Sequence, residues 1–121
     1  MWVDLTVNNA EGIRDFYQQV VGWQPSPVDM GDYQDYNMLG PDQQPAVGVC
    51  HKQGPNADQP SQWMIYITVD DLDQSLAAVE ANGGKVLSPI RGGGGTRFAV
   101  IQDPAGAVCS LFEQSAAPDA E

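Results

Sequence analysis

An internal repeat constrains the fold of this chain more than any other feature of its sequence. PAVGVC, residues 45–50, matches PAGAVC, residues 104–109, at an offset of 59. A second alignment, at an offset of 62, places Val3, Leu5 and Val7 opposite Ile65, Ile67 and Val69. Turns can absorb the difference between the two offsets. The repeat therefore predicts one structural unit that occurs twice.

The first unit, residues 1–52, shows the pattern of strand, helix, strand, strand, strand. Trp2 to Val7 alternates two sets of side chains, as a strand with one covered face does. Asn8, followed three residues later by Glu11, predicts a helix cap, and Gly22 predicts the end of that helix. The remaining strands are predicted over residues 23–30, 33–38 and 46–51.

The second unit, residues 62–113, repeats this order after a polar linker at residues 53–61. A strand is predicted over 63–69, a helix from Leu72 with Asp70 or Asp71 as its cap, and strands over 85–90, 97–102 and 107–113. Pro104 and Gly106 favour a tight turn, which predicts a hairpin from 101 to 113. With a frayed tail at 114–121, the whole chain, 1–121, is expected to be one domain.

Charge and composition limit the partners and the compartment. Sixteen acidic residues and five basic ones give a formal net charge of −11, which argues against nucleic-acid and membrane partners and permits cationic ligands. No apolar run approaches the ~20 residues that span a bilayer, and Trp2 and Asp4 do not suit a signal peptide, so we expect a cytoplasmic protein. Cys50 and Cys109 are expected to be reduced, buried thiols.

The order of the stretches DLTV, FY, GW and DPAG within two such units resembles the vicinal-oxygen-chelate superfamily. That superfamily contains glyoxalase I, extradiol dioxygenases, fosfomycin-resistance enzymes and bleomycin-binding proteins, and the resemblance covers residues 2–113. It implies an α+β fold in which two tandem βαβββ units form a curved mixed sheet, shaped as a cup. The most similar subfamily is a small glyoxalase-like group whose first strand also begins with Trp.

The resemblance also implies four cup-facing positions that hold a metal ion in the superfamily's enzymes, usually through His, Gln or Glu. In this chain those positions are predicted to carry Trp2, His51, Met64 and Ser110. Trp does not coordinate metals, and neutral Ser and thioether Met are poor ligands for hard or borderline ions, so His51 is the one suitable donor of the four. We therefore expect a member without a metal cofactor; the alternative is a divalent metal held by His51 and unidentified partners.

The cup that remains is expected to bind a small organic molecule. Strand parity predicts a lining that consists of Trp2, Asp4, Thr6, Val49, His51, Met64, Tyr66, Thr68, Ser110 and Phe112. Aromatic and thioether walls suit a flat, partly apolar ligand, Asp4 can pair with a cationic group, and His51 can form a hydrogen bond. Purely structural roles for Asp4 and His51, closing a collapsed core, remain the competing interpretation.

Three functions follow from this interpretation. The first is a binding protein for a small aromatic or cationic molecule; the second is a metal-dependent lyase or dioxygenase of the glyoxalase I type. The third is metal-free acid/base catalysis through Asp4 and His51. No spacing in the sequence specifies a reaction or a catalytic residue. A homodimer is expected from the superfamily's habit and from an apolar outer surface at Trp23, Tyr33 and Tyr36.

Overall fold

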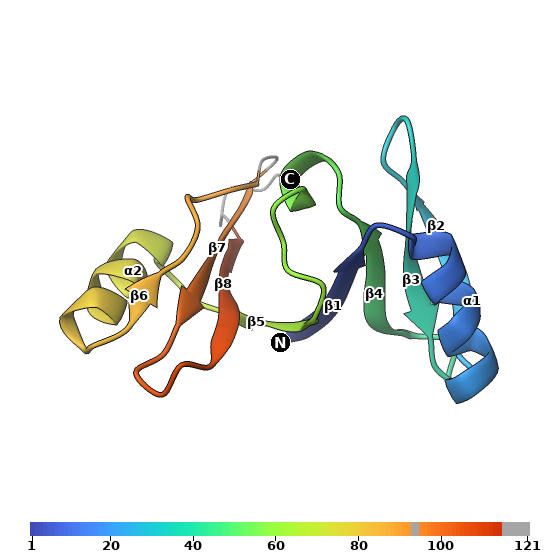
Figure 1. Cartoon of the computed structure of the whole chain (residues 1–121), viewed down its shortest axis with the longest axis horizontal. Helices are drawn as coiled ribbons and strands as arrows, with labels where there is room; N and C mark the ends of the chain where they lie inside the picture. Colours follow the sequence, from blue (N-terminus) through green and yellow to red (C-terminus); the bar gives the residue numbers. More distant parts are fainter. Residues whose placement is uncertain (93–94, 115–121) are drawn as a thin grey trace. The chain divides into compact units, whose positions relative to one another are not determined.

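The computed structural model describes residues 1–92 and 95–114. Within these ranges the elements run in the order β1 (Trp2–Val7), α1 (Ala10–Val21), β2 (Gln24–Asp29), β3 (Gln34–Leu39), β4 (Pro45–His51), η1 (Gly54–Asn56), β5 (Trp63–Thr68), α2 (Leu72–Ala81), β6 (Lys85–Val86), β7 (Thr96–Gln102) and β8 (Val108–Gln114). The predicted α+β fold with two tandem βαβββ units is confirmed (Figure 1). Of the predicted tail, Gln114 ends β8, and the other residues lie outside the described ranges.

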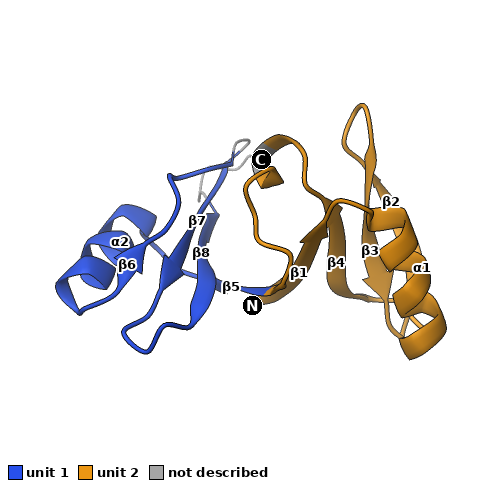
Figure 2. Cartoon of the chain, in the orientation of Figure 1, with its two compact units in different colours: residues 1, 64–121 blue, residues 2–63 orange. Residues whose placement is uncertain are grey.

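The chain divides into two compact units, which Figure 2 shows in different colours. The N-terminal unit comprises residues 2–63, and the C-terminal unit comprises residue 1 and the chain from residue 64 onward. The strand order is β2-β3-β4-β1 in the first and β5-β8-β7-β6 in the second. In each unit the first strand pairs with the last in parallel and the other pairs are antiparallel, as the repeat requires.

Side-chain caps set where both helices begin. The Asn9 side chain accepts a hydrogen bond from the Gly12 amide at 3.1 Å, so the cap of α1 lies one residue after the predicted Asn8. Gly22 ends α1 with φ of 87°, as predicted, because glycine adopts the left-handed conformation without strain. Asp71, the second of the two predicted caps, accepts from the Gln74 amide at 3.1 Å and begins α2.

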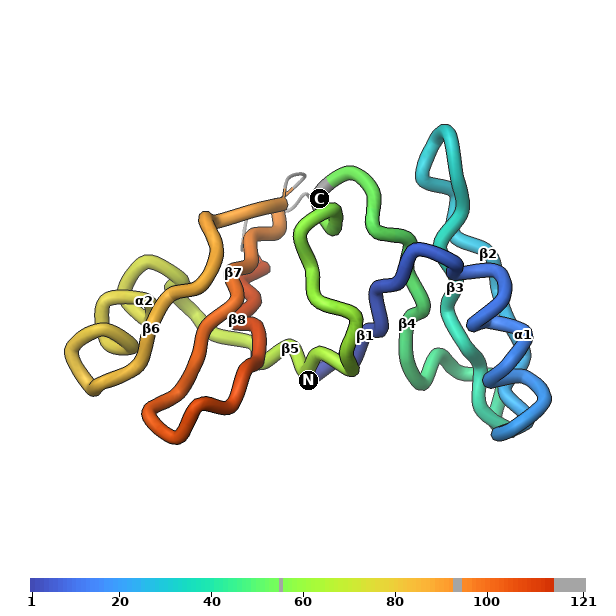
Figure 3. The backbone as a smooth tube through the Cα atoms, in the orientation of Figure 1, coloured from blue at the N-terminus to red at the C-terminus, as the bar shows by residue number. Residues whose placement is uncertain are grey.

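The predicted hairpin consists of β7 and β8, joined by the turn from Asp103 to Ala107 (Figure 3). The Asp103 carboxylate accepts from the amides of Ala105 at 2.8 Å and Ala107 at 3.0 Å. Gly106 has φ of 92°; a positive φ in this turn favours glycine, which adopts it without strain. The hairpin places seven residue pairs of β7 and β8 in register and thereby fixes which side of β8 each side chain faces.

Strand β6 is shorter than predicted, and the reason is local. It spans Lys85–Val86, after which the Ser88 hydroxyl, rather than a backbone carbonyl, accepts a hydrogen bond from the Val100 amide. Pro89 then removes a backbone donor. One further isolated bridge joins Arg91 to Phe98.

Each helix covers one face of the sheet of its own unit. Beneath α1 lies a buried cluster that comprises Ala10, Tyr36, Met38 and Val49, with Val7, Ile13, Trp23 and Val47 packed against it. Beneath α2 the cluster comprises Leu72, Ile101 and Leu111, with Val69, Leu76, Val79 and Cys109 around it. Both cysteines are free thiols, Cys50 buried as predicted and Cys109 partly exposed. None of the helices in the described ranges combines the length and the apolar composition needed to cross a bilayer.

Candidate functional site

The face of the N-terminal sheet that points away from α1 carries a group of polar side chains. Tyr36, Met38 and Val49 point into the core under α1, so the residues that alternate with them on the same strands point the other way. Strand pairing places these neighbours side by side, with Asp4 opposite Gly48 and Gly48 opposite Asn37. We call this group the acidic face; it consists of Trp2, Asp4, Thr6, Asp35, Asn37, Gly48 and Cys50.

Trp2, Asp4 and Gly48 fit one another closely on strands β1 and β4. The Trp2 indole Nε1 donates a hydrogen bond to the Asp4 carboxylate. A Cβ atom at position 48 would overlap the Asp4 carboxylate oxygen and would lie 3.5 Å from Trp2 Cζ2. The missing side chain of Gly48 is therefore what leaves room for the carboxylate beside the indole.

The Asp4 carboxyl is electrostatically unusual. Its pKa is raised from 3.8 to about 6, chiefly because burial disfavours the charged form. The negative charge of Asp35 raises the pKa further, whereas the hydrogen bond from Trp2 lowers it. A carboxyl group with this pKa changes its charge near neutral pH, so it can pair with a cation or exchange a proton there.

Asp35 brings a second carboxylate to the acidic face, and this residue is only 6% exposed. Its Oδ1 accepts a hydrogen bond from the His51 backbone amide at 2.8 Å, and the Cys50 thiol also bonds to this carboxylate. Burial raises the pKa of the Cys50 thiol strongly, and the negative charges of Asp4 and Asp35 raise it further. The thiol therefore stays protonated and is no nucleophile.

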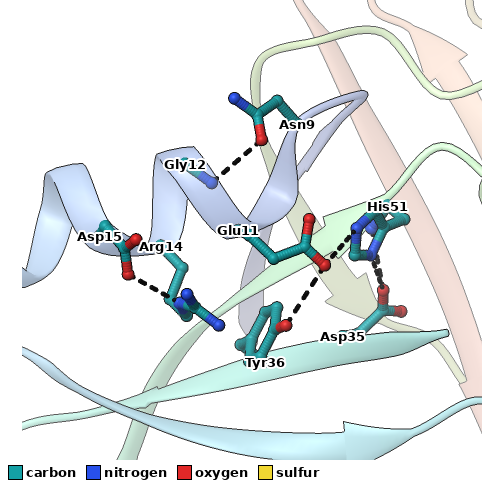
Figure 4. Close-up of polar contacts among 8 residues, drawn as sticks. All are labelled: Asn9, Glu11, Gly12, Arg14, Asp15, Asp35, Tyr36 and His51. Carbon is teal, nitrogen blue, oxygen red and sulfur yellow. Dashed lines mark hydrogen bonds and ion pairs between the residues drawn. The ribbon is translucent and has the colours of Figure 1, made fainter.

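His51 does not lie where the sequence predicted. Val49 is fully buried in the cluster under α1, so the prediction that it faces the same side as Asp4 is wrong. His51 follows it two residues later, at the end of β4, and its Nε2 lies 3.0 Å from Glu11 Oε2 on α1 (Figure 4). The imidazole is thus turned toward the helix and is not part of the acidic face.

The incorrect expectation came from the shorter repeat offset. Leu5 pairs with Val49 in β4, and Ile67 pairs with Leu111 in β8. Leu5 and Ile67 are equivalent at an offset of 62, so Val49 is equivalent to Leu111, His51 to Glu113 and Gly48 to Ser110. The match at 59 between PAVGVC and PAGAVC inverts the face of one strand, because side chains alternate with a period of two.

In the C-terminal unit the predicted residues form an uncharged set. Tyr66 pairs with Ser110, and Thr68 pairs with Phe112. Ser110 is fully buried and its hydroxyl donates to the Ala99 carbonyl at 3.2 Å, while the Tyr66 ring lies 5.8 Å from Phe98. Met64 and Tyr66 are buried, whereas Thr68 is exposed. This unit therefore presents aromatic, thioether and hydroxyl groups without a charge.

With the corrected register, the four positions that hold a metal in the superfamily's enzymes carry Trp2, Gly48, Met64 and Ser110. An indole and a glycine supply no ligand atom, and a thioether and a hydroxyl bonded to a backbone carbonyl are weak donors. In the part of the chain that the structure describes, no three His, Cys, Asp or Glu side chains are grouped so as to hold a metal ion. This set of residues does not fit a catalytic metal centre.

Sequence reasoning missed Asp35, Asn37, Gly48 and Cys50. Asp35 could have been found, because polar Asp35 and Asn37 alternate with Tyr36 and Met38 in β3 and so share the face opposite the core. Gly48 and Cys50 required the longer offset. The remaining predicted residues of this unit, Trp2, Asp4 and Thr6, are brought together as expected.

Several known proteins are similar to this chain in sequence. The sequence model of the Glyoxalase/Bleomycin resistance protein/Dioxygenase superfamily matches residues 1–111. CFP32 of Mycobacterium bovis, provisionally named a glyoxylase, is 32% identical over 114 residues, which cover 93% of this chain and 43% of that protein. DnrV of Streptomyces peucetius, named an anthracycline biosynthesis protein, is 30% identical over 133 residues, which cover 99% of this chain and 48% of that protein.

Solved structures show the same fold at low identity. A superfamily member from Vibrio splendidus has a TM-score of 0.60 at 12% identity, covering 93% of this chain and 97% of its own. Methylmalonyl-CoA epimerase from Mycobacterium tuberculosis has a TM-score of 0.57 at 17% identity, covering 93% of this chain and 85% of its own. The chain spans about half the length of the curated relatives that it matches.

Proposed function

The chain belongs to the glyoxalase/bleomycin resistance protein/dioxygenase superfamily, and we propose that it binds a small cationic or aromatic organic molecule at the acidic face without the help of a metal ion. The observation that carries the proposal is the Asp4 carboxylate beside the indole of Trp2, on the same sheet face as a second carboxylate, Asp35, whose charge raises the pKa of Asp4. None of the seven residues of the acidic face is basic, so a positive charge on a ligand could pair with these carboxylates.

An aromatic cation matches this chemistry. An ammonium group gains from a partly buried carboxylate because the low local dielectric strengthens the attraction, and an indole can stack on an aromatic ring or hold a cation over its face. The net charge of −11 attracts such ligands over a distance and repels anionic ones. DnrV is named for the biosynthesis of anthracyclines, which are polycyclic aromatic compounds, and this name is compatible with an aromatic ligand.

The metal-dependent alternative is disfavoured by the donor set. The four positions that hold a metal in the superfamily's enzymes lack the basic nitrogen or carboxylate ligands that a divalent ion needs; here they carry Trp2, Gly48, Met64 and Ser110. A member without these ligands can still use the fold to hold an organic molecule. We therefore place metal-free binding first and a metal-dependent lyase or dioxygenase second.

A matched pair of probes tests the proposal by isothermal titration. Tryptamine carries an aromatic ring and an ammonium group, and tryptophol carries the same ring with a neutral hydroxyl. At pH 7.5 we expect saturable binding of tryptamine that is about tenfold tighter than that of tryptophol, the difference being one charge-assisted contact. The preference should shrink at high salt and should survive prior treatment with EDTA.

Three outcomes would contradict this expectation. Absence of saturable heat with either probe removes the proposed function, and equal affinity for both removes the role of the carboxylates. Loss of binding after EDTA that is restored by Zn²⁺ or Mn²⁺ would favour the metal-dependent alternative. The third possible function, acid/base catalysis through Asp4 and His51 together, is disfavoured because His51 is turned toward α1.

We also propose a homodimer, although its surface differs from the one first expected. Tyr36 is only 4% exposed and belongs to the core, so it is not part of an outer apolar surface. On α1, however, Phe16 is 53% exposed, Val20 62% and Val21 51%. Light scattering at micromolar concentration should give twice the monomer mass, and Val20→Asp should give the monomer; a monomeric wild type would refute the proposal.

A cytoplasmic location, without nucleic-acid or membrane partners, remains our prediction.

A further inference from the structure

His51 is a buried imidazole between two carboxylates that come from different elements. Its Nε2 lies 3.0 Å from Glu11 Oε2 on α1, and its Nδ1 lies 3.5 Å from Asp35 Oδ1 on β3. The His51 residue is 6% exposed, and Figure 4 shows the ring placed between the two carboxylates. One of these carboxylates, Asp35, belongs to the acidic face, and the other does not.

The groups around the ring leave the two carboxylates as its polar partners. The Tyr36 hydroxyl, on β3, donates to Glu11 at 3.4 Å, and the Tyr33 ring meets the imidazole edge-on with centroids 5.5 Å apart. On α1, Arg14 lies over the Tyr36 ring at 4.7 Å. Cys50 and Lys52 flank His51 in the chain, and β1 faces it with Val7. The hydrogen bond from His51 is the largest cause that lowers the pKa of Glu11.

The two contacts of the ring differ in kind. Nε2 is within hydrogen-bond distance of Glu11, whereas Nδ1 has no hydrogen-bond partner although it is buried. Nδ1 lies 3.5 Å from Asp35 Oδ1 and forms no hydrogen bond with it, so the ring can attract this carboxylate only when the ring is charged. A neutral imidazole has one N–H group and no charge. An imidazolium has two N–H groups and a positive charge, which attracts Asp35.

The equivalent position in the C-terminal unit has a fixed charge. Glu113, at an offset of 62 from His51, accepts from the Leu72 amide at 2.7 Å and from Arg97 at 2.9 Å. Both positions therefore connect the last strand of a unit to the first turn of its helix. The N-terminal unit does so with a side chain whose charge can change, next to a carboxylate of the acidic face.

We propose that His51 is a positioning residue that sets the net negative charge of the acidic face: as a cation it neutralises the nearly buried Asp35, and without its charge the negative charge of Asp35 adds to the attraction of a cationic ligand. The proposal rests on the proposed function and adds its regulation. Acidification then weakens binding in two ways, because Asp4 gains a proton and His51 gains a charge. A cationic ligand, in turn, favours the neutral form of His51, since linkage is reciprocal.

Two variants remove the charge of His51, and each keeps a polar group near the position of one ring nitrogen. His51→Asn carries an amide near the place of Nδ1, and His51→Gln carries one near the place of Nε2. At pH 6.5 we expect both variants to bind tryptamine about tenfold tighter than the wild type, because a cation is lost at a short distance from the ligand. Tryptophol binding should change less than about twofold, because it does not respond to that charge.

Imidazole nitrogen NMR provides a readout that needs no variant, since the chain contains one histidine. Addition of tryptamine to the wild type at pH 6.5 should move the ring-nitrogen signals from those of the imidazolium toward those of the neutral imidazole. Tryptophol should leave them in place. A merely structural histidine would show no such difference between the two probes.

The outcomes separate this inference from the proposed function. If the wild type prefers tryptamine but its ring-nitrogen signals do not respond, the inference about His51 is wrong and the proposed function stands. Equal losses of affinity for both probes in both variants would likewise show a structural role only. If the wild type binds neither probe, the proposed function fails and this inference fails with it.

Discussion

Asp4→Asn should make the protein more stable at pH 7.5 and at the same time weaken its preference for a cationic ligand. The folded-state pKa of Asp4, about 6, exceeds its ordinary value of 3.8. The folded protein therefore binds this proton more tightly than the unfolded chain does, and Asp4 lowers stability as pH rises from about 4 to 6. Above pH 6 the full penalty applies, and asparagine, which cannot ionise, removes it.

The size of the effect follows from the same two values. The difference between 3.8 and about 6 corresponds to about 3 kcal/mol, which partial exposure of Asp4 reduces to about 2 kcal/mol. In a domain of this size we expect the Tm at pH 7.5 to rise by about 5 to 10 °C. Asparagine also keeps an oxygen that can accept the hydrogen bond from Trp2.

Calorimetric melts at pH 7.5 and pH 4 check the sign, because the gain should vanish at pH 4, where the wild-type carboxyl is protonated in the folded state. Asp32→Asn, at an exposed position, serves as the control and should leave the Tm unchanged. Titration with tryptamine should show a loss of at least about tenfold in affinity, with tryptophol unaffected. A variant that is less stable than the wild type at pH 7.5 would contradict this account of Asp4.

Gly48→Ala should damage both the fold of the acidic face and its binding. The new Cβ would overlap the Asp4 carboxylate oxygen and press toward Trp2, so the hydrogen bond between these two side chains has to break or shift. We expect a loss of about 2 kcal/mol in the free energy of unfolding, typical of overpacking at a tight contact. Tryptamine and tryptophol should both bind at least about tenfold more weakly, because carboxylate and indole are displaced together.

Gly40→Ala provides the matched control for this variant. There the added Cβ would lie 3.3 Å from an oxygen of the Asp42 side chain, which is exposed and can move. Urea unfolding should therefore show a change below about 0.5 kcal/mol for Gly40→Ala. Wild-type stability and binding in Gly48→Ala would show that position 48 does not constrain Asp4.

The sequence by itself determined the order of the elements, the C-terminal end of α1, the cap of α2 and the hairpin at Asp103. These features depend on interactions between residues close together in the chain: a cap of α2 at Asp71, a left-handed Gly22, and a turn that Pro104 and Gly106 favour. The alternation in β1 likewise placed Trp2, Asp4 and Thr6 on one face correctly. Local stereochemistry is sufficient for such features, so a single sequence reveals them.

Only the tertiary structure decided which strand faces meet. Register between β1 and β4 depends on contacts between residues more than 40 positions apart, and an error of three residues in the repeat exchanged Gly48 for His51. The raised pKa of Asp4 and the placement of His51 between Glu11 and Asp35 depend on burial and on neighbours from other elements. Such neighbours are created by packing, and no local pattern in the sequence specifies them.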